Sequence, residues 1–247
     1  NRNITRTKNI NEIVPTRSRH RYCPAIMLSV IIPTRNADAG LPVTLACLAV
    51  QRSEAGIGEI IVADGESAVA PDVARFGAVM ISAPAGRGIQ LAAGADAATG
   101  DWLLFLHADT ILGDGWARAV QAHMAGSSKA AVFRFRLDDT RIRARILELL
   151  VHWRCRLFAL PYGDQGLLIS RSLYDETGGF RPLPLMEDVD LVRRIGRRRL
   201  ASLDVPAITS AQRYVRDGYV SRIARNLACL AMWSLGVSPD RIRRFYK

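Results

Sequence analysis

The chain has 247 residues, 49% of them apolar, which is enough for the core of one α/β domain or of two small ones. Its 34 Lys and Arg exceed its 23 Asp and Glu, so the net charge is +11 and the expected partners are anionic: a membrane face or a phosphorylated substrate. Aromatic residues do not alternate with the basic ones as base stacking requires, so we expect no nucleic acid partner. The four cysteines form no Cys-x-x-Cys pair, which argues against a zinc or iron–sulfur site and favours a reducing, cytoplasmic setting.

Residues 1–26 carry six basic side chains and one acidic one and lack an apolar core. We therefore predict a disordered basic extension rather than a signal peptide, with Met27 as a natural start. No run of about 18 apolar residues follows, so we predict no membrane-spanning helix. The rest divides into a folded domain over residues 27–211 and a basic helical segment over residues 212–247.

Strands and helices alternate through the first half of the folded domain. Runs of β-branched and apolar residues predict strands, and apolar residues at helical spacing predict helices. The predicted strands are 28–32, 59–63, 78–82 and 102–106, and the predicted helices are 41–51, 72–75 and one that opens at Gly86-Arg87-Gly88 and ends at Gly100. Such alternation indicates a parallel sheet with right-handed crossovers.

Polar turns follow three of these strands. They are Pro33-Thr34-Arg35-Asn36 after the first strand, Asp64-Gly65-Glu66-Ser67 after the second and His107-Ala108-Asp109 after the fourth. The carboxyl ends of parallel strands meet at one edge of a sheet, where open α/β sheets bind their ligands. The sequence therefore predicts a site at this edge.

The second half of the folded domain contains weaker signals. It predicts helices at 116–124, 141–160 and 186–197, strands at 131–137, 167–170 and 200–205, a turn at 162–166 and a loop over 178–184. Residues 219–237 predict an amphipathic helix with Arg222 and Arg225 on its early turns. Two interpretations of this helix stay open: it lies in a membrane interface with Trp233 at headgroup level, or it packs on the folded domain or on a second subunit.

Six segments, taken in order, resemble the family 2 glycosyltransferases of the GT-A fold. They are SVIIPTRN, EIIVADGES, GRG, GDWLLFLHADT, GDQGLLISRSLYDETGGF and MEDVDLVRR, and they span about residues 28–211. Each is weakly specific alone, whereas the ordered set is specific. The resemblance implies an α/β fold with a Rossmann-like, mostly parallel sheet flanked by helices, here with a helical C-terminal extension. It also implies a nucleoside-diphosphate sugar, UDP- or GDP-linked, lying across the first strands.

The resemblance assigns the nucleotide-binding residues. Pro33-Thr34-Arg35 matches the turn that closes over the base and ribose, and Asp64 matches the acid that accepts a hydrogen bond from the base. An Asx-turn with Gly65 is the structural alternative for Asp64. Arg87 and Arg213 match basic residues that meet the diphosphate, and the alternative for Arg87 is an ordinary solvated arginine.

The segment His107-Ala108-Asp109 matches the family's Asp-x-Asp metal motif, with histidine in place of the first acid. The resemblance implies Mn²⁺ or Mg²⁺ held by a carboxylate, which would neutralise charge on the diphosphate leaving group. Asp109 is the ligand by position. As a second ligand, His107 would favour manganese, since imidazole suits Mn²⁺ better than Mg²⁺. The alternative is that His107 only caps the strand.

The acidic pair Glu187-Asp188 matches the one that precedes the acceptor-side helix. Inverting members use one carboxylate as general base toward the acceptor hydroxyl, and Asp188 aligns with it. Glu187 is then structural or orients the acceptor, and Asp164 and Gln165 lie in a loop that matches the lining of the acceptor site. The alternative is that these acids only complement the helix dipole.

Together these matches predict a cytoplasmic, metal-dependent, inverting transfer of a sugar to an acceptor hydroxyl. The family's late Gln-x-x-Arg-Trp motif is absent, so we predict a single transfer rather than polymer synthesis. If the membrane interpretation holds, the protein is peripheral on the inner face of the cell membrane and the acceptor is a lipid. The sequence indicates no oligomeric state.

Two other classes stay open. A nucleotidyltransferase would also present an acidic sheet edge to a nucleotide, but it usually has a longer Gly-rich loop after the first strand. A non-catalytic membrane-surface or partner-binding protein that retains the fold would not be stabilised by a nucleoside diphosphate.

Overall fold

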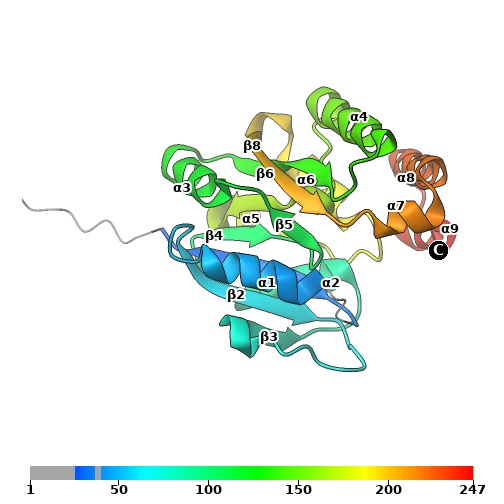
Figure 1. The fold of residues 1–247 in the computed structure, drawn as a ribbon. Coiled ribbons are helices and arrows are strands. Elements are labelled where there is room, and N and C mark those ends of the chain that lie inside the picture. The colour runs from blue at the N-terminus through cyan, green and yellow to red at the C-terminus, as the bar shows by residue number, and fades with distance from the viewer. Residues whose placement is uncertain (1–25, 37–39, 247) are drawn as a thin grey trace, which may run out of the picture.

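The computed structural model describes residues 26–36 and 40–246, so the predicted extension lies, apart from Ile26, outside the described residues. An eight-stranded sheet in the order β3-β2-β1-β4-β7-β6-β8-β5 forms its centre (Figure 1). The strands are β1 Leu28–Thr34, β2 Ile57–Asp64, β3 Val79–Ser82, β4 Trp102–Phe105, β5 Thr110–Leu112, β6 Ala130–Leu137, β7 Leu167–Ser170 and β8 Leu200–Thr209.

Helices cover both faces of this sheet. They are α1 Gly40–Val50, α2 Arg87–Ala97, α3 Trp116–Gly126, α4 Ile142–Phe158, α5 Arg171–Glu176, α6 Glu187–Ile195, α7 Gln212–Asp217, α8 Tyr219–Ser234 and α9 Pro239–Tyr246. Short 3₁₀ turns are η1 Ala74–Phe76, η2 Gly163–Gln165 and η3 Arg197–Arg199. The fold class expected from the sequence, α/β with a mostly parallel sheet, is confirmed.

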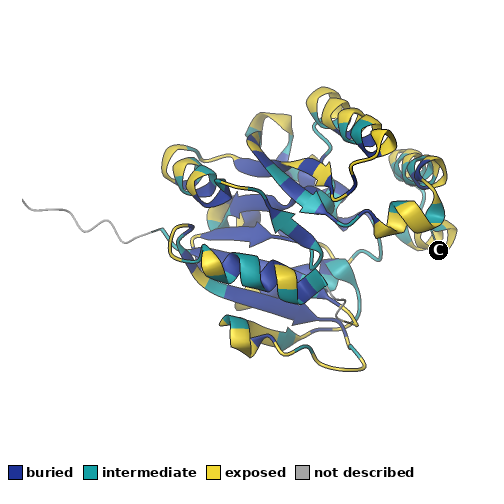
Figure 2. Ribbon diagram, viewed as in Figure 1, coloured by how far each residue is buried: buried dark blue, intermediate teal, exposed yellow. Residues whose placement is uncertain are grey.

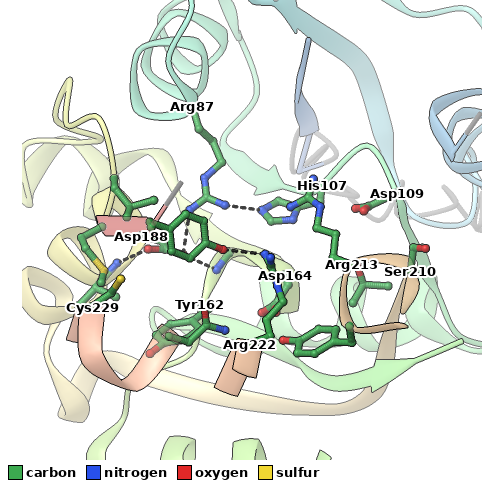
Figure 3. A pocket seen from close by; sticks show the side chains of 18 residues that line it. Arg87, His107, Asp109, Tyr162, Asp164, Asp188, Ser210, Arg213, Arg222 and Cys229 are labelled. Atoms are coloured by element: carbon green, nitrogen blue, oxygen red, sulfur yellow. Dashed lines mark hydrogen bonds and ion pairs between the residues drawn. The ribbon is translucent and has the colours of Figure 1, made fainter. Parts of the chain in front are cut away.

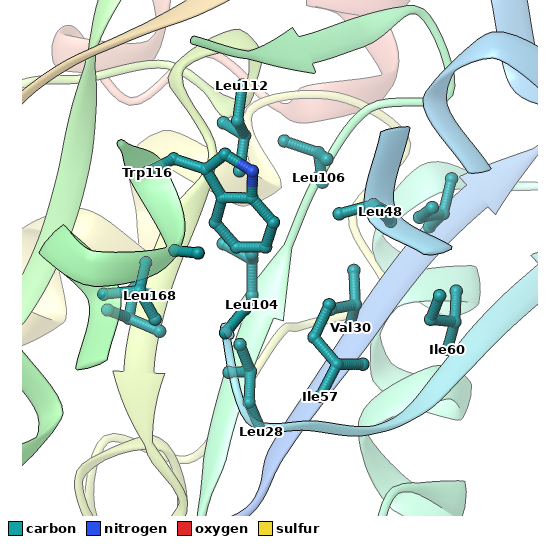
Figure 4. Packing of buried hydrophobic residues seen from close by; sticks show 14 of the residues in the cluster. Leu28, Val30, Leu48, Ile57, Ile60, Leu104, Leu106, Leu112, Trp116 and Leu168 are labelled. Carbon is teal, nitrogen blue, oxygen red and sulfur yellow. The ribbon is translucent and has the colours of Figure 1, made fainter. Parts of the chain in front are cut away.

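The central strands are buried on both faces, which explains their continuous apolar runs (Figure 2). Successive side chains of β1 point to opposite faces of the sheet. Val30 packs in the cluster that contains Leu45 of α1 and Trp116 of α3 (Figure 4), whereas Ile31 packs in the cluster that contains Leu91 of α2. The sheet is therefore held between two apolar layers, and its strand ends are fixed in place.

Parallel pairing brings the strand ends together as predicted. Thr34 of β1 is paired with Asp64 of β2, and Ile31 with Phe105 of β4, so their polar turns follow at one edge. The second half of the sheet departs from the parallel expectation, since β7 runs antiparallel to β4 and β6, and β5 antiparallel to β8. Alternation of strands and helices cannot distinguish these cases, because antiparallel neighbours can be far apart in sequence.

Several elements differ from the prediction. The helix expected at 72–75 is the 3₁₀ turn η1, and β8 continues to Thr209 beyond the predicted end at 205. The sequence reading missed β5, α5, α7 and α9, which span three, six, six and eight residues. Elements this short contain too few residues for a hydrophobic period to be recognised.

The C-terminal segment consists of three helices rather than one. Tyr219 and Cys229 of α8 are buried, and Trp233 packs with Ile242 of α9 in a cluster that includes Val189 of α6. Of the two interpretations left open for this helix, these contacts support packing on the folded domain, because the face of α8 that carries Trp233 packs on the protein. None of the helices within the described ranges combines the length and apolarity that crossing a bilayer requires.

Candidate active site

Two open hollows share a wall at the carboxyl ends of β1 and β4. The first, which we call the β1 hollow, is lined by Pro33, Thr34, Arg35, Arg87, Gln90, His107, Ala108, Asp109 and Arg213. The second, the α6 hollow, shares Arg87, His107, Asp109 and Arg213 and extends to Asp188 and the C-terminal helices (Figure 3).

The rim of the β1 hollow is fixed by Gln90, a residue that the sequence analysis missed. Its side-chain amide donates to the carbonyl oxygens of Thr34 at 2.6 Å and Ala63 at 2.8 Å, and the Gly65 amide donates to Thr34 at 2.8 Å. Gln90 thereby ties the ends of β1 and β2 together. One indication of this role is visible in the sequence: Gln90 is a polar residue among the apolar residues Leu91 and Ala95. In α2 all three side chains are buried.

Asp64 is buried in the turn after β2. Its carboxylate accepts hydrogen bonds from the Ser67 amide, at 3.0 Å, and from the Ser67 hydroxyl. Asp64 is not among the residues that line the β1 hollow. The structural alternative, a side chain that closes its own turn, is therefore present, with Ser67 rather than Gly65 as the partner. A carboxylate has acceptor capacity left beyond two hydrogen bonds, so contact with a base stays a prediction.

Arg87 lies at the centre of an ion network and is only partly exposed, so it is not an ordinary solvated arginine. Its guanidinium pairs with Glu187, which is 1% exposed, and approaches Asp188 at 3.4 Å. Burial alone would lower the pKa of Arg87, but the adjoining carboxylates of Glu187 and Asp188 outweigh it and raise the pKa. Gly88 permits this approach of α2 to α6 and to the loop before it, because a Cβ there would lie 3.2 Å from the Cβ of Glu187 and 2.5 Å from the carbonyl oxygen of Arg181.

His107 points toward the same network. Its Nε2 lies 3.4 Å from the Arg87 guanidinium, and since a guanidinium only donates, Nε2 accepts and the ring proton lies on Nδ1. Burial, together with the positive charge of Arg87, lowers the pKa of His107 to about 3. The imidazole is therefore neutral at neutral pH and its lone pair is directed at Arg87.

Asp188 faces the α6 hollow with a fixed orientation. Its Oδ2 accepts from the Gly163 amide at 2.7 Å and faces Arg87, while Oδ1 accepts from the Val189 amide at 2.8 Å. A Cβ on Gly163 would lie 2.9 Å from His107 Nε2 and 3.3 Å from Asp188 Oδ2, so glycine is what lets η2 approach. An oriented carboxylate at a hollow can accept a proton from a bound hydroxyl.

Of the other three residues assigned to the acceptor side, only one lines the α6 hollow. Asp164 lines the α6 hollow, and its Oδ1 is buried without a hydrogen-bond partner among the described residues. Burial raises the pKa of Asp164 to about 6, and Asp188 adds to the rise. Gln165 instead points inward and donates to the Phe133 carbonyl at 3.0 Å. Glu187 lies beneath Arg87. Neither Glu187 nor Gln165 lines the α6 hollow.

The C-terminal helices close the far side of the α6 hollow. Tyr214, Arg222, Asn226 and Tyr246 line it alongside Arg213, which reaches both hollows from α7. Arg222 is held by Asp217 at 2.9 Å and by the Tyr246 hydroxyl at 2.7 Å. Only Arg213 of this set was identified from the sequence, because the others are placed by the packing of α8 and α9.

The donor set for a divalent cation is small. Across residues 26–36 and 40–246, no three His, Cys, Asp or Glu side chains come together as ligands. Asp109 lines both hollows and offers a hard carboxylate oxygen, which suits Mn²⁺ or Mg²⁺. The His107 lone pair is directed at Arg87, so the residues fit a cation through Asp109, with the remaining ligands left to a bound diphosphate.

Structural comparison places the fold among known glycosyltransferases. Glucosyl-3-phosphoglycerate synthase from Mycobacterium tuberculosis, solved with Mn²⁺, UDP and glucosyl-3-phosphoglycerate, matches with a TM-score of 0.54 at 20% identity, over 73% of this chain and 70% of that chain. The same synthase with Mg²⁺ and UDP gives a TM-score of 0.52 at 20% identity, over 73% and 69%. S. aureus TarS 1-349 gives a TM-score of 0.59 at 15% identity, over 89% and 70%. At these identities the likeness shows a shared fold, the GT-A fold.

Sequence comparison identifies the family. No curated protein sequence matches the chain significantly. The model of glycosyl transferase family 2 matches residues 29–183, well over half of the chain, and this range contains Arg87, His107 and Asp109 of the shared wall, and Asp164. The chain therefore belongs to glycosyl transferase family 2 and is a glycosyltransferase of the GT-A fold.

Proposed function

We propose that this protein transfers a single sugar from a nucleoside-diphosphate sugar to an acceptor hydroxyl, with inversion at the anomeric carbon and with the help of a divalent cation. One observation carries the proposal: the two hollows meet at Arg87, His107, Asp109 and Arg213. A donor in the β1 hollow would place its diphosphate at this shared wall, and an acceptor would fill the α6 hollow.

The charges at the wall support this division. Arg213 reaches both hollows and would offset the negative charge of the diphosphate. Arg87 is committed to Glu187 and Asp188, so its main role would be to hold the base in place. Asp188 would accept the proton of the acceptor hydroxyl as the hydroxyl oxygen attacks the anomeric carbon from the side opposite the diphosphate.

The cation would be held by Asp109 and by oxygens of the diphosphate. When bound, Mn²⁺ or Mg²⁺ would supply charge neutralisation to the leaving group. The synthase structures with either ion and UDP support this choice. Neutral His107 would orient Arg87 rather than act as a ligand.

Thermal unfolding tests the donor site without knowledge of the acceptor. UDP and GDP are each added with and without Mn²⁺, and a ligand that binds only the folded state stabilises it by about 2.7 kcal/mol at a hundredfold excess over Kd. We expect one nucleotide to raise the melting temperature only with Mn²⁺. The Asp109→Asn variant should lose this rise, whereas the control Asp114→Asn, an exposed acid just after β5, should keep it.

The outcomes separate the candidate classes. If neither UDP nor GDP changes the melting temperature with Mn²⁺, the assignment of the β1 hollow as the donor site is refuted. If a nucleotide stabilises Asp109→Asn as strongly as wild type, the cation site is elsewhere. Once a donor is known, NMR of the product gives the anomeric configuration, and net retention would exclude Asp188 as a base in a single displacement.

A further inference from the structure

The helix α4 has two apolar faces. Its inner face buries Ala144, Leu147 and Val151 against Tyr219 of α8 and the end of β6. Its outer face presents six large apolar side chains that are 49–76% exposed: Ile142, Ile146, Leu149, Leu150, Trp153 and Leu157. Their spacing places all six on one side of the helix, opposite the buried side. We call these six residues the α4 stripe, and Figure 2 shows exposed residues along this helix.

Positive charge borders the α4 stripe. Arg143 lies on one edge of it and Arg156 on the other by helical spacing, and both are exposed. Among the described residues neither forms a salt bridge to an acid, and the Arg143 guanidinium lies 5.4 Å from the centroid of the Tyr219 ring. The one acid of α4, Glu148, pairs with Arg145 at 2.6 Å and accepts from the Leu137 amide at 2.9 Å. The outer face therefore combines exposed apolar surface with uncompensated positive charge.

The inner side of α4 lies close to the α6 hollow. Arg154 of α4 stacks over the ring of Tyr162 at 3.6 Å, and Tyr162 lines the hollow. Tyr214, which also lines the hollow, packs on the cluster under α4. A surface that bound the α4 stripe would thus be separated from the α6 hollow by α4 itself, which lies beside α8 (Figure 1).

We propose that the α4 stripe docks the protein on an anionic membrane surface. An interfacial helix places its apolar face at the boundary between headgroups and acyl chains, with basic side chains on the lipid phosphates. The aliphatic stems of Arg143 and Arg156 can extend along the apolar stripe while their charged ends reach the headgroups. The net charge of +11 adds a general attraction to such a surface.

Charge favours a membrane over a second copy of the chain. In a two-fold dimer the same stripe would face itself, which would bring Arg143 and Arg156 of both copies together. Glu148, the acid nearest to them on α4, is already paired. Lipid phosphates supply the missing negative charge, and the docking requires no transferase activity, so it can be tested apart from the proposed function.

Vesicle sedimentation tests the proposal with the full chain. Vesicles of phosphatidylcholine alone are compared with vesicles of phosphatidylcholine and phosphatidylglycerol in equal parts. We expect the protein to pellet with the anionic vesicles, and the fluorescence of Trp153 to shift to the blue, since Trp102 and Trp116 are already buried and Trp233 packs partly buried against Ile242. The double variant Ile146→Asp/Leu150→Asp should weaken binding by more than about tenfold.

Two further variants control the measurement. Arg143→Gln/Arg156→Gln should reduce the preference for anionic vesicles by about fivefold per charge. Val50→Asp, at an 85% exposed apolar position on α1, should bind as wild type does. Circular dichroism checks that each variant is folded. The proposal is overturned if wild type pellets with neither vesicle, if the aspartate pair binds like wild type, or if ultracentrifugation finds a dimer that the aspartate pair dissociates.

Discussion

Replacing Glu187 by glutamine would remove a negative charge from beneath Arg87 with almost no change in volume. Glu187 is 1% exposed, whereas the Arg87 side chain is 35% exposed and keeps Asp188 at 3.4 Å. Breaking a fully buried ion pair costs about 3–5 kcal/mol. Because Arg87 reaches solvent and retains a second carboxylate, we expect the variant to lose about 2 kcal/mol of unfolding free energy.

Urea unfolding followed by tryptophan fluorescence measures this loss. The matched control is Glu54→Gln, which removes an exposed carboxylate 3.6 Å from the exposed Arg118 and should cost less than about 0.5 kcal/mol. In thermal unfolding, about 2 kcal/mol corresponds to a decrease of about 4–8 °C for a chain of this size. If Glu187→Gln costs no more than the control, the pair with Arg87 does not hold the wall of the site.

An apolar replacement of Arg87 and Glu187 separates the effect of the ion pair on stability from its effect on sugar transfer. Arg87→Met/Glu187→Leu removes both members of the buried pair and leaves only Asp188 without its arginine partner, so it should recover part of the lost unfolding free energy. If Arg87 positions the site, the same variant should still transfer sugar far more slowly than wild type. Recovery of both stability and activity would show that the ion pair is dispensable.

Two other predictions concern the α6 hollow. Because burial raises the pKa of Asp164 from 3.8 to about 6, the folded state holds this proton more tightly than the unfolded chain, and its contribution to stability declines as the pH rises from about 4 to about 6. Asp164→Asn should therefore gain on the order of 2 kcal/mol over wild type at neutral pH and little at acid pH, as measured by urea unfolding; a constant difference would contradict the assignment. Gly163→Ala should slow transfer on the order of a hundredfold by displacing Asp188, while the nucleotide-dependent melting shift is kept. An unchanged rate would show that η2 can yield to a methyl group.

The first half of the fold could be predicted from the sequence, because its signals are local. Apolar runs ending in Pro33, Asp64 and His107 marked three strands, and parallel pairing required their ends to meet. The antiparallel placement of β7 and β5 could not be predicted in this way. Their partners are set by long-range packing, and β5 is only three residues long.

The candidate site shows the same division. Ordered motifs identified Asp188, Asp109 and Arg213 as residues of one region, and all three line the α6 hollow. The roles of neighbouring residues could not be read in this way: Gln165 and Glu187 are adjacent in sequence to Asp164 and Asp188, yet they point inward. Side-chain direction within a turn or first helical turn depends on what packs against it.

By itself, the sequence determined the order of strands and turns, the family and the residue types at the sheet edge, since these depend on neighbours along the chain. Only the tertiary structure decided that Gln90 ties two strand ends, that Arg87 is paired and that α8 and α9 close the α6 hollow. It also decided which face of α4 stays exposed. Each of these contacts joins segments far apart in sequence, and the free energy of such contacts comes from burial and charge pairing that no local pattern records.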